Sequence, residues 1–213
     1  VIVSADDPGP ISSQTEQDTR RFADFCRIPV FDPSSPEEAY KMIGEAFEYS
    51  EKYNTPVLFR PTTRVCHAYA SIDNCDSPSP KKYEGFVKDS KKWVIFPRLS
   101  FANHIMIEKR NVEIGNDFST YSANKAEGGN SEKAVVTSGI SYAYTKECLK
   151  DYPDVKLIKI ATAYPFPEDF VLSSLEGTKE VLCIEELSPF IEEQILKPVS
   201  YTHLRAHETE ADL

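Results

Sequence analysis

Residues 29–60 read PVFDPSSPEEAYKMIGEAFEYSEKYNTPVLFR, and the order of patterns in this segment indicates the architecture of the first half of the chain. It opens with a strand-like run at 29–31 and closes with another at 57–60, and between them Ser35 and Pro36 provide a helix cap and a proline at the first helical position. The apolar residues that follow step by three and four, as an amphipathic helix requires. They are Ala39, Met42, Ile43, Ala46 and Phe47. Strand, helix and strand in this order predict a parallel sheet.

The same alternation continues toward the start of the sequence. Val1 to Ala5 predicts a strand, which the prolines and glycine of residues 6–10 end in a rigid loop. Because the chain opens directly into this run, we expect that a further piece precedes it. Ser13 to Glu16 has capping-box spacing, and Phe22, Phe25 and Cys26 would follow on one face of the helix that starts there.

Residues 71–132 have a different character, and we interpret them as a connecting region. From Ser71 to Lys92, prolines and charges occur with little apolar periodicity, which is typical of a linker. Beyond it we predict a strand from Trp93 to Phe96, a helix from Leu99 to Val112, and a polar connection from Gly115 to Lys133.

A second alternating block occupies residues 133–198 and predicts a small doubly wound α/β domain, although it contains no GxGxxG fingerprint. The predicted strands are 134–139, 155–160 and 180–184, and the predicted helices run through Tyr144 and Leu149, then over 168–175 and 190–196. The turn Thr137-Ser138-Gly139 is either an anion site at a helix start or a plain strand-to-helix turn. We interpret residues 199–213 as a non-native tail.

Composition excludes several classes of protein. The 213 residues are 40% hydrophobic, which is enough for one large core or two small ones. With 34 acidic against 24 basic residues, the net charge of -10 would repel nucleic acid. There is no run of eighteen apolar residues, and the first residues lack the basic region of a signal peptide. We therefore expect a cytoplasmic protein with neither a membrane nor a nucleic-acid partner.

The cysteines give no metal signal. Five of them form an odd set with wide gaps and no CxxC, and each is best explained as a reduced thiol. The nearest approach to a metal cluster is Cys66, His67 and Cys75, which lacks the paired knuckle that tetrahedral zinc requires. We assign no metal.

Two loops at predicted strand ends are rich in reactive side chains, and ligands of parallel sheets bind at such ends. The first, DDPGPISSQTEQ at residues 6–17, contains Ser12, Ser13 and Gln14, although helix capping explains at least one of the serines. The second, RPTTRVCH at residues 60–67, contains two guanidinium groups and an imidazole.

Arg64 is the candidate for an anion contact, because its fork donates two charge-assisted hydrogen bonds to a carboxylate or phosphate. A salt bridge within the domain or to a partner explains it equally well. His67 is either a proton carrier or a structural hydrogen-bond donor.

Two long stretches resemble the second half of the pyrimidine-binding domain of the indolepyruvate ferredoxin oxidoreductase family. They read VIVSADDPGPISSQTEQDTRRFA (1–23) and PSSPEEAYKMIGEAFEYSEKYNTPVLFRPTTRVCH (33–67). Three later stretches are similar to the next domain of that family, which resembles the transketolase C-terminal domain. They read AVVTSGISYAYTKE (134–147), YPFPEDFV (164–171) and EVLCIEELSPFIEEQI (180–195). The resemblance implies an α/β chain with a pyrimidine-binding part at 1–70 and a transketolase-like domain at 133–198.

The resemblance also implies a function. Members of the family oxidatively decarboxylate arylpyruvates on thiamine diphosphate and Mg²⁺, pass electrons through 4Fe-4S clusters to ferredoxin, and release an arylacetyl-CoA formed with coenzyme A. The activating glutamate, the diphosphate domain and the cluster cysteines lie outside this chain, and a second (beta) subunit is the implied partner. Ser12, Ser13, Gln14, Arg64 and His67 would lie near substrate or cofactor. One departure is Ile11, where the family usually has histidine.

Two alternatives stay open at this point. The chain fits a subunit of a pyruvate-type 2-oxoacid ferredoxin oxidoreductase, and it also fits a noncatalytic α/β binding module, because a fold does not fix a function.

Overall fold

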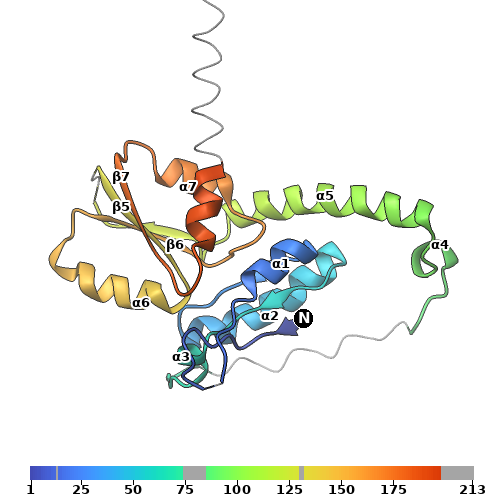
Figure 1. The fold of residues 1–213 in the computed structure, drawn as a ribbon, viewed down its shortest axis with the longest axis horizontal. Helices are drawn as coiled ribbons and strands as arrows, with labels where there is room; N and C mark the ends of the chain where they lie inside the picture. Colours follow the sequence, from blue (N-terminus) through green and yellow to red (C-terminus); the bar gives the residue numbers. More distant parts are fainter. Residues whose placement is uncertain (13, 74–84, 130–131, 198–213) are drawn as a thin grey trace, which may run out of the picture.

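The first sheet of the protein is parallel, as residues 29–60 predict. In the computed structural model, which describes residues 1–12, 14–73, 85–129 and 132–197 (Figure 1), the strands lie in the order β1, β3, β2. Their bounds are Ile2–Val3 for β1, Leu58–Phe59 for β3 and Val30–Phe31 for β2. Leu58 of the central strand pairs with Ile2 on one side and Val30 on the other.

Helix α2 (Pro36–Tyr53) connects β2 to β3 and begins where the sequence predicts. The Ser35 hydroxyl accepts a hydrogen bond from the Glu38 N–H at 3.2 Å, which caps the first turn. The predicted apolar stripe is confirmed at Met42 and Ala46, which are buried. It is wrong at Phe47, which is 56% exposed because it lies beyond the edge of the stripe that faces the sheet.

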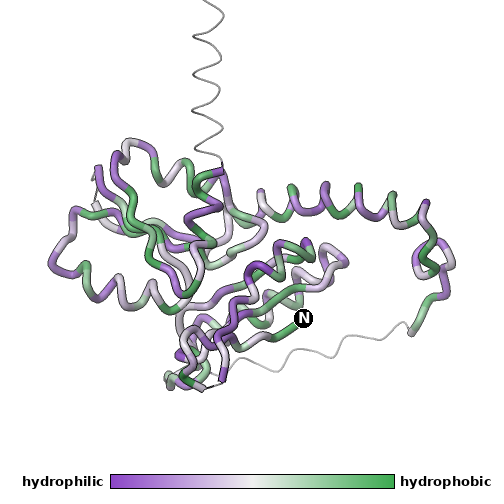
Figure 2. Tube along the Cα trace, in the orientation of Figure 1, coloured by the Kyte–Doolittle hydropathy of each residue, from purple (hydrophilic) through white to green (hydrophobic). Residues whose placement is uncertain are grey.

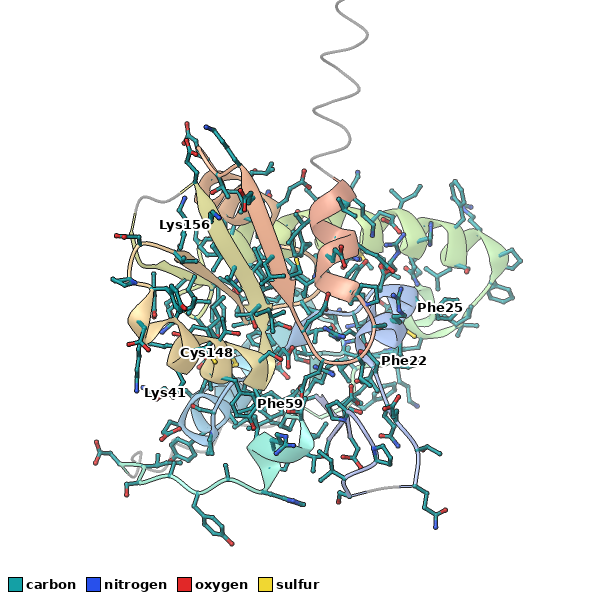
Figure 3. The ribbon with its side chains drawn as sticks, turned by 60° about the vertical axis from the view of Figure 1, so that its left-hand side comes forward. Phe22, Phe25, Lys41, Phe59, Cys148 and Lys156 are labelled. Atoms are coloured by element: carbon teal, nitrogen blue, oxygen red, sulfur yellow. The ribbon has the colours of Figure 1, made fainter. Side chains whose placement is uncertain are left out.

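Helix α1 (Arg20–Cys26) starts later than predicted, and its aromatic residues face outward. Phe22 is 51% exposed and Phe25 is 87% exposed (Figure 3), whereas Arg20 and Ala23 are buried. The capping-box prediction at 13–16 is therefore wrong about where the helix begins, and Ser13 itself lies outside the described residues. The physical reason is long-range: the buried carboxylate of Asp6 accepts hydrogen bonds from Thr19, which fixes the helix start there.

The connecting region contains more regular structure than its polarity predicts. After α3 (Thr63–Cys66) come α4 (Ser90–Trp93), the long helix α5 (Pro97–Ser119) and the strand β4 (Lys125–Glu127). The strand predicted at 93–96 is therefore wrong, and the predicted polar connection from 115 to 133 contains the end of α5 and β4. The helix continues past Val112 because Ile114 and Phe118 keep the helical spacing and are fully buried.

The second sheet has the strand order β4, β6, β5, β7, in which only β4 is antiparallel to its neighbour. Its elements are β5 (Lys133–Ser138), α6 (Gly139–Cys148), η1 (Leu149–Asp151), β6 (Lys156–Ile160), α7 (Glu168–Ser174), β7 (Glu180–Ile184) and a helix at 190–197. The alternation of strands and helices predicted for this block is confirmed.

The two sheets share an apolar core. One buried cluster joins Val30 and Leu58 of the first sheet to Val136 and Ile158 of the second. Backbone hydrogen bonds continue the contact, because the Val30 N–H donates to the Tyr164 carbonyl at 2.7 Å. The carboxyl ends of the first sheet therefore lie directly against the second sheet.

The N-terminal half of helix α5 lies outside the core that the two sheets share. Figure 1 shows it extending away from both sheets toward α4, and Figure 2 shows hydrophobic and hydrophilic residues alternating along it. Asn111, Ile114 and Phe118 anchor its C-terminal half in the core. Among the described helices, none combines the length and the apolar character needed to cross a bilayer.

Candidate functional site

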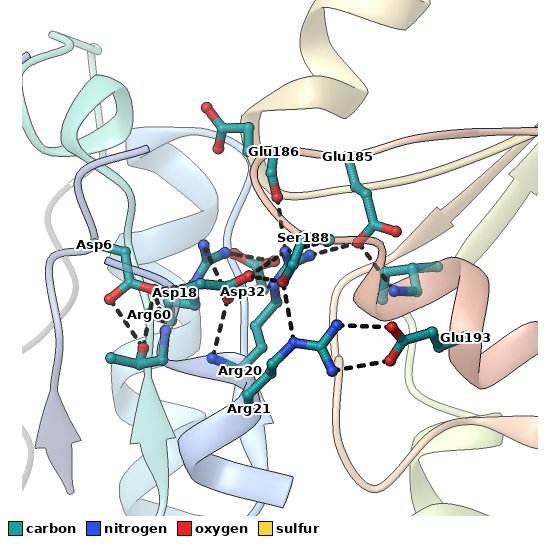
Figure 4. A network of polar contacts seen from close by, with 12 residues as sticks. Asp6, Asp18, Arg20, Arg21, Asp32, Arg60, Glu185, Glu186, Ser188 and Glu193 are labelled. Carbon is teal, nitrogen blue, oxygen red and sulfur yellow. Dashed lines mark hydrogen bonds and ion pairs between the residues drawn. The ribbon is translucent and has the colours of Figure 1, made fainter. Parts of the chain in front are cut away.

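Three charged side chains follow the three strands of the first sheet and meet at its carboxyl edge (Figure 4). Asp6 comes shortly after β1, Asp32 directly after β2, and Arg60 directly after β3. Each is at most 1% exposed. Parallel strands bring their carboxyl ends to one edge of a sheet, so the topology alone places these residues together.

Arg60 lies between the two carboxylates. Its Nε donates to Asp6, and its Nη1 lies 3.2 Å from Asp32 Oδ1. Burial raises the pKa of Asp32, although the charge of Arg60 opposes the shift. The third nitrogen, Nη2, is buried without a hydrogen-bond acceptor among the described residues, and it lies 3.9 Å from the carboxylate of Asp18.

Arg20 forms a second buried centre beside the first. It is 1% exposed, and all three guanidinium nitrogens donate hydrogen bonds. Asp18 accepts two of these bonds at 2.8 Å each, and Glu185 accepts one at 2.7 Å. Burial works against ionisation of Asp18, but the hydrogen bonds and charge of Arg20 outweigh it and hold the pKa of that carboxyl well below its usual range.

A groove of about 780 Å³ opens over these two centres. Three segments line it: the loop after β1, helix α3, and the loop after β7. The lining residues are Pro8, Gly9, Glu16, Gln17, Asp18, Arg64, Glu186, Leu187 and Ser188. The groove is therefore bounded by strand-end loops from both sheets, which is where ligands of open α/β sheets bind.

Of the predicted site residues, Arg64 lies in this groove. Its side chain is exposed, and no ion pair joins it to another charged group in the part of the chain that the structure describes. Ser12 and Gln14 are exposed on the neighbouring loop but do not line the groove, and the Ser12 N–H donates to Asp7 at 2.7 Å. His67 ends helix α3 and is also exposed, and Ser13 lies outside the described residues.

Sequence reasoning missed Glu186, which lines the groove with Arg64. Burial raises the pKa of Glu186, while the charges of Arg60, Arg20 and Arg64 act in the opposite direction. The sequence contains a signal that indicates this residue, because Glu185 and Glu186 directly follow the correctly predicted strand β7. The rule that led to Arg64 applies to them equally.

Two further sequence hypotheses concern ions. At Thr137-Ser138-Gly139 the start of α6 lies against the carboxylate of Asp32, so a side chain of the protein itself occupies the place considered for an anion. Within the described ranges, no three His, Cys, Asp or Glu side chains are placed to hold a metal ion. Cys66 and His67 are exposed, and Cys75 lies outside those ranges.

The architecture matches that of a solved structure. A solved 2-oxoglutarate:ferredoxin oxidoreductase from Magnetococcus marinus, with 2-oxoglutarate, coenzyme A and succinyl-CoA bound, has the same fold. The match has a TM-score of 0.63 at 15% identity and covers 91% of this chain and 42% of that one. The chain therefore has an α/β fold found in 2-oxoacid:ferredoxin oxidoreductases.

Sequence relatives identify the particular family. Indolepyruvate oxidoreductase subunit IorA is 38% identical in Thermococcus kodakarensis and 37% identical in Pyrococcus horikoshii, each over 203 residues that cover 92% of this chain. The same subunit of Methanothermobacter thermautotrophicus is 35% identical over 200 residues. No family model matches the chain. The chain belongs to the IorA family, and it spans about a third of the length of these relatives, 31% to 32%.

Proposed function

We propose that this chain is part of the subunit of an indolepyruvate oxidoreductase that binds the 2-oxoacid, in a cytoplasmic complex. The observation that carries the proposal is the groove between the two sheets, in a chain that is 38% identical to an IorA subunit over 92% of its length. In this proposal residues 1–70 form part of a pyrimidine-binding domain, 71–132 connect it, and 133–198 form the transketolase-like domain.

Arg64 is the residue that would hold the substrate carboxylate. Its guanidinium lies in the groove without an ion pair among the described residues, so both edges of the fork remain available. A carboxylate can accept two parallel hydrogen bonds from such a fork. Helix α3 holds the backbone of Arg64 in place, because the Thr63 N–H donates to the Asp6 carbonyl at 2.9 Å.

The lining of the groove suits the acid end of an arylpyruvate rather than its ring. Pro8 and Leu187 are the large apolar side chains of the lining, and no aromatic residue is among the described residues that form it. Binding sites for aromatic rings are usually lined by apolar and aromatic side chains. The ring would therefore be held by residues outside this groove.

Thiamine diphosphate, Mg²⁺, 4Fe-4S clusters and coenzyme A belong to the proposed full-length subunit, with a beta subunit and ferredoxin as partners. The described residues do not fit the metal groups, because they contain no cluster of metal ligands. The four cysteines described are free thiols on separate elements: Cys26, Cys66, Cys148 and Cys183. The contribution proposed for this chain is to bind and orient the substrate.

Kinetics of the complete subunit, assembled with its partner, test this role. We expect Arg64→Ala to cost about 2 to 4 kcal/mol in transition-state stabilisation, because a charged group would lose its partner. Arg64→Lys keeps the charge but loses the bidentate geometry, so kcat/KM should also fall. The measurement is ferredoxin reduction with indolepyruvate, and Arg98→Ala on the distant helix α5 is the matched control. Unchanged kinetics with lowered stability would make Arg64 a structural residue.

A further inference from the structure

We propose that Arg20 sets the width of the groove by holding its two walls together, and that it keeps Leu187 in a left-handed backbone conformation. This inference rests on the proposed function only in taking the groove as the binding site. It assigns a positioning role to a residue that does not itself line the groove.

The first wall is the loop after β1, and Arg20 holds its end. Asp18 lines the groove and receives two hydrogen bonds from Arg20, through Nε and Nη2. This bidentate pair fixes the orientation of Asp18 as well as its distance, because the carboxylate and the guanidinium fork are both planar. Asp18 thereby becomes a fixed edge of the groove.

The second wall is the loop after β7, and the same guanidinium holds it. Nη1 donates to the Glu185 carboxylate at 2.7 Å. Nη2 has two hydrogens for three acceptors, so besides its bond to Asp18 it makes a shared hydrogen bond to the backbone carbonyls of Glu186 at 2.7 Å and Ser188 at 3.1 Å. Both carbonyls converge on one nitrogen, although they belong to residues two positions apart. The residue between them must turn the chain sharply.

That residue is Leu187, and its φ is 66°. A bulky side chain rarely adopts this left-handed conformation, which is unfavourable for any residue except glycine. Such strain persists only where surrounding contacts over-determine the backbone. The carbonyls on both sides of Leu187, those of Glu186 and Ser188, accept hydrogen bonds from the one buried guanidinium of Arg20. The Phe190 N–H also donates to the Ser188 carbonyl at 2.7 Å, but Arg20 is the group that contacts the chain on both sides of the turn.

Arginine is required for this arrangement. A lysine ammonium could reach one or two of the acceptors, but it has no planar fork with which to bind Asp18 and two carbonyls together. Buried Arg20 also packs over the ring of Phe190 at 5.5 Å, which holds the guanidinium between the walls. A second link joins the walls directly, because the Ser188 hydroxyl donates to Asp18 at 2.7 Å.

Hydrogen exchange of the 213-residue chain tests the proposal without any ligand. In Arg20→Lys, we expect the amides of residues 185–188 and 190 and of 14–19 to exchange at least tenfold faster, while amides in β5 and β6 keep their rates. Arg21→Lys is the matched control, because Arg21 joins the same elements through exposed contacts to Glu193 and the Ser188 hydroxyl, and it makes no bond to the carbonyls beside Leu187 among the described residues. It should change exchange in both loops by less than threefold.

A double-mutant cycle tests the strain at Leu187. Leu187→Gly should slow local exchange at 185–190 in the wild-type background, because glycine adopts a positive φ freely. In the Arg20→Lys background, the loop can leave the left-handed conformation, so the same substitution should lose most of that effect. Equal effects in both backgrounds, or a loosening of one wall alone, would overturn the proposal. Neither result would bear on the Arg64 kinetics, so the two hypotheses fail separately.

Discussion

The carboxylate of Asp32 lies beside Gly139, on the side where a side chain would start. A β-carbon built on Gly139 would come within 3.1 Å of Asp32 Oδ1, and the glycine has a φ of 52°. Asp32 ends a strand of the first sheet, and Gly139 begins helix α6 of the second. The positive end of a helix favours a carboxylate at this position, so the contact is a point where the two sheets depend on each other.

We expect Gly139→Ala to destabilise the protein by about 1 to 3 kcal/mol, because alanine would be strained at this φ and would crowd the carboxylate. Urea unfolding measures the change. Gly44→Ala is the control, since Gly44 lies in the exposed interior of α2 with no atom near its missing β-carbon. That substitution should stabilise the helix by up to roughly 1 kcal/mol. Equal stability of the Gly139 variant and the wild type would contradict the role given to this contact.

Glu127 should make the fold sensitive to acid. Partial burial opposes its ionisation, but hydrogen bonds from Lys146, Lys125 and Tyr142 prevail and lower its pKa to about 2, from a usual value of 4.5. Because the folded pKa lies below the unfolded one, the carboxylate stabilises the fold above pH 4.5 and this contribution is lost as the pH falls toward 2.

The thermal midpoint of Glu127→Gln, measured between pH 6 and pH 2.5, checks this expectation. The variant should melt below the wild type at pH 6, and the difference should shrink in acid. Glu180→Gln is the control, because Glu180 pairs with Lys133 on an exposed edge of the sheet. A pH-independent difference for Glu127→Gln would show that its effect is not electrostatic.

The 213-residue chain alone should be catalytically inert. Calorimetry should detect no thiamine diphosphate binding tighter than millimolar, or about -4 kcal/mol, because the family resemblance implies that the activating glutamate and the diphosphate domain lie outside these residues. Ferredoxin reduction with an arylpyruvate should likewise be absent. Micromolar binding, or measurable reduction, would place the cofactor site within this chain.

Local sequence patterns predict most of the fold. Strong signals mark the cap at Ser35, the stripe of α2 and the apolar strand β7, and all of them act over a few residues. Strand β4 escapes prediction because it has only three residues, two of them charged, and it forms by pairing with β6. The orientation of α1 is also not predicted, because it depends on a contact that is distant in the sequence. Periodicity places Phe22, Phe25 and Cys26 on one face, whereas the buried residues are Arg20 and Ala23, and the Arg20 partner Glu185 lies 165 positions away.

The candidate site is predictable in location but not in composition. The rule that ligands bind at the carboxyl ends of parallel strands leads to Arg64, and the structure places Arg64 in a groove at that edge. The same rule leads to Glu186 once strand β7 is assigned. Nothing in the local sequence reveals that Arg20 joins the walls, because its acceptors come from segments distant in the chain and include two backbone carbonyls.

Helix α5 is held in the core at one end only, so a tilt at that end moves the other end through a larger distance. Its C-terminal half is fixed in the core at Asn111, Ile114 and Phe118, and its N-terminal half stands outside the body. The distance from Pro97 to Asn111 along the helix is roughly 21 Å at 1.5 Å per residue. A tilt of about 5° at the fulcrum would therefore swing the far end by roughly 2 Å. The helix packs against α7. Along the chain, α7 is followed by strand β7, and β7 is followed directly by the groove wall at 185–188. A small rotation of the second sheet that tilts α5 would thus move α4, at the far end of the helix, by a larger distance than any residue of α5 in the core.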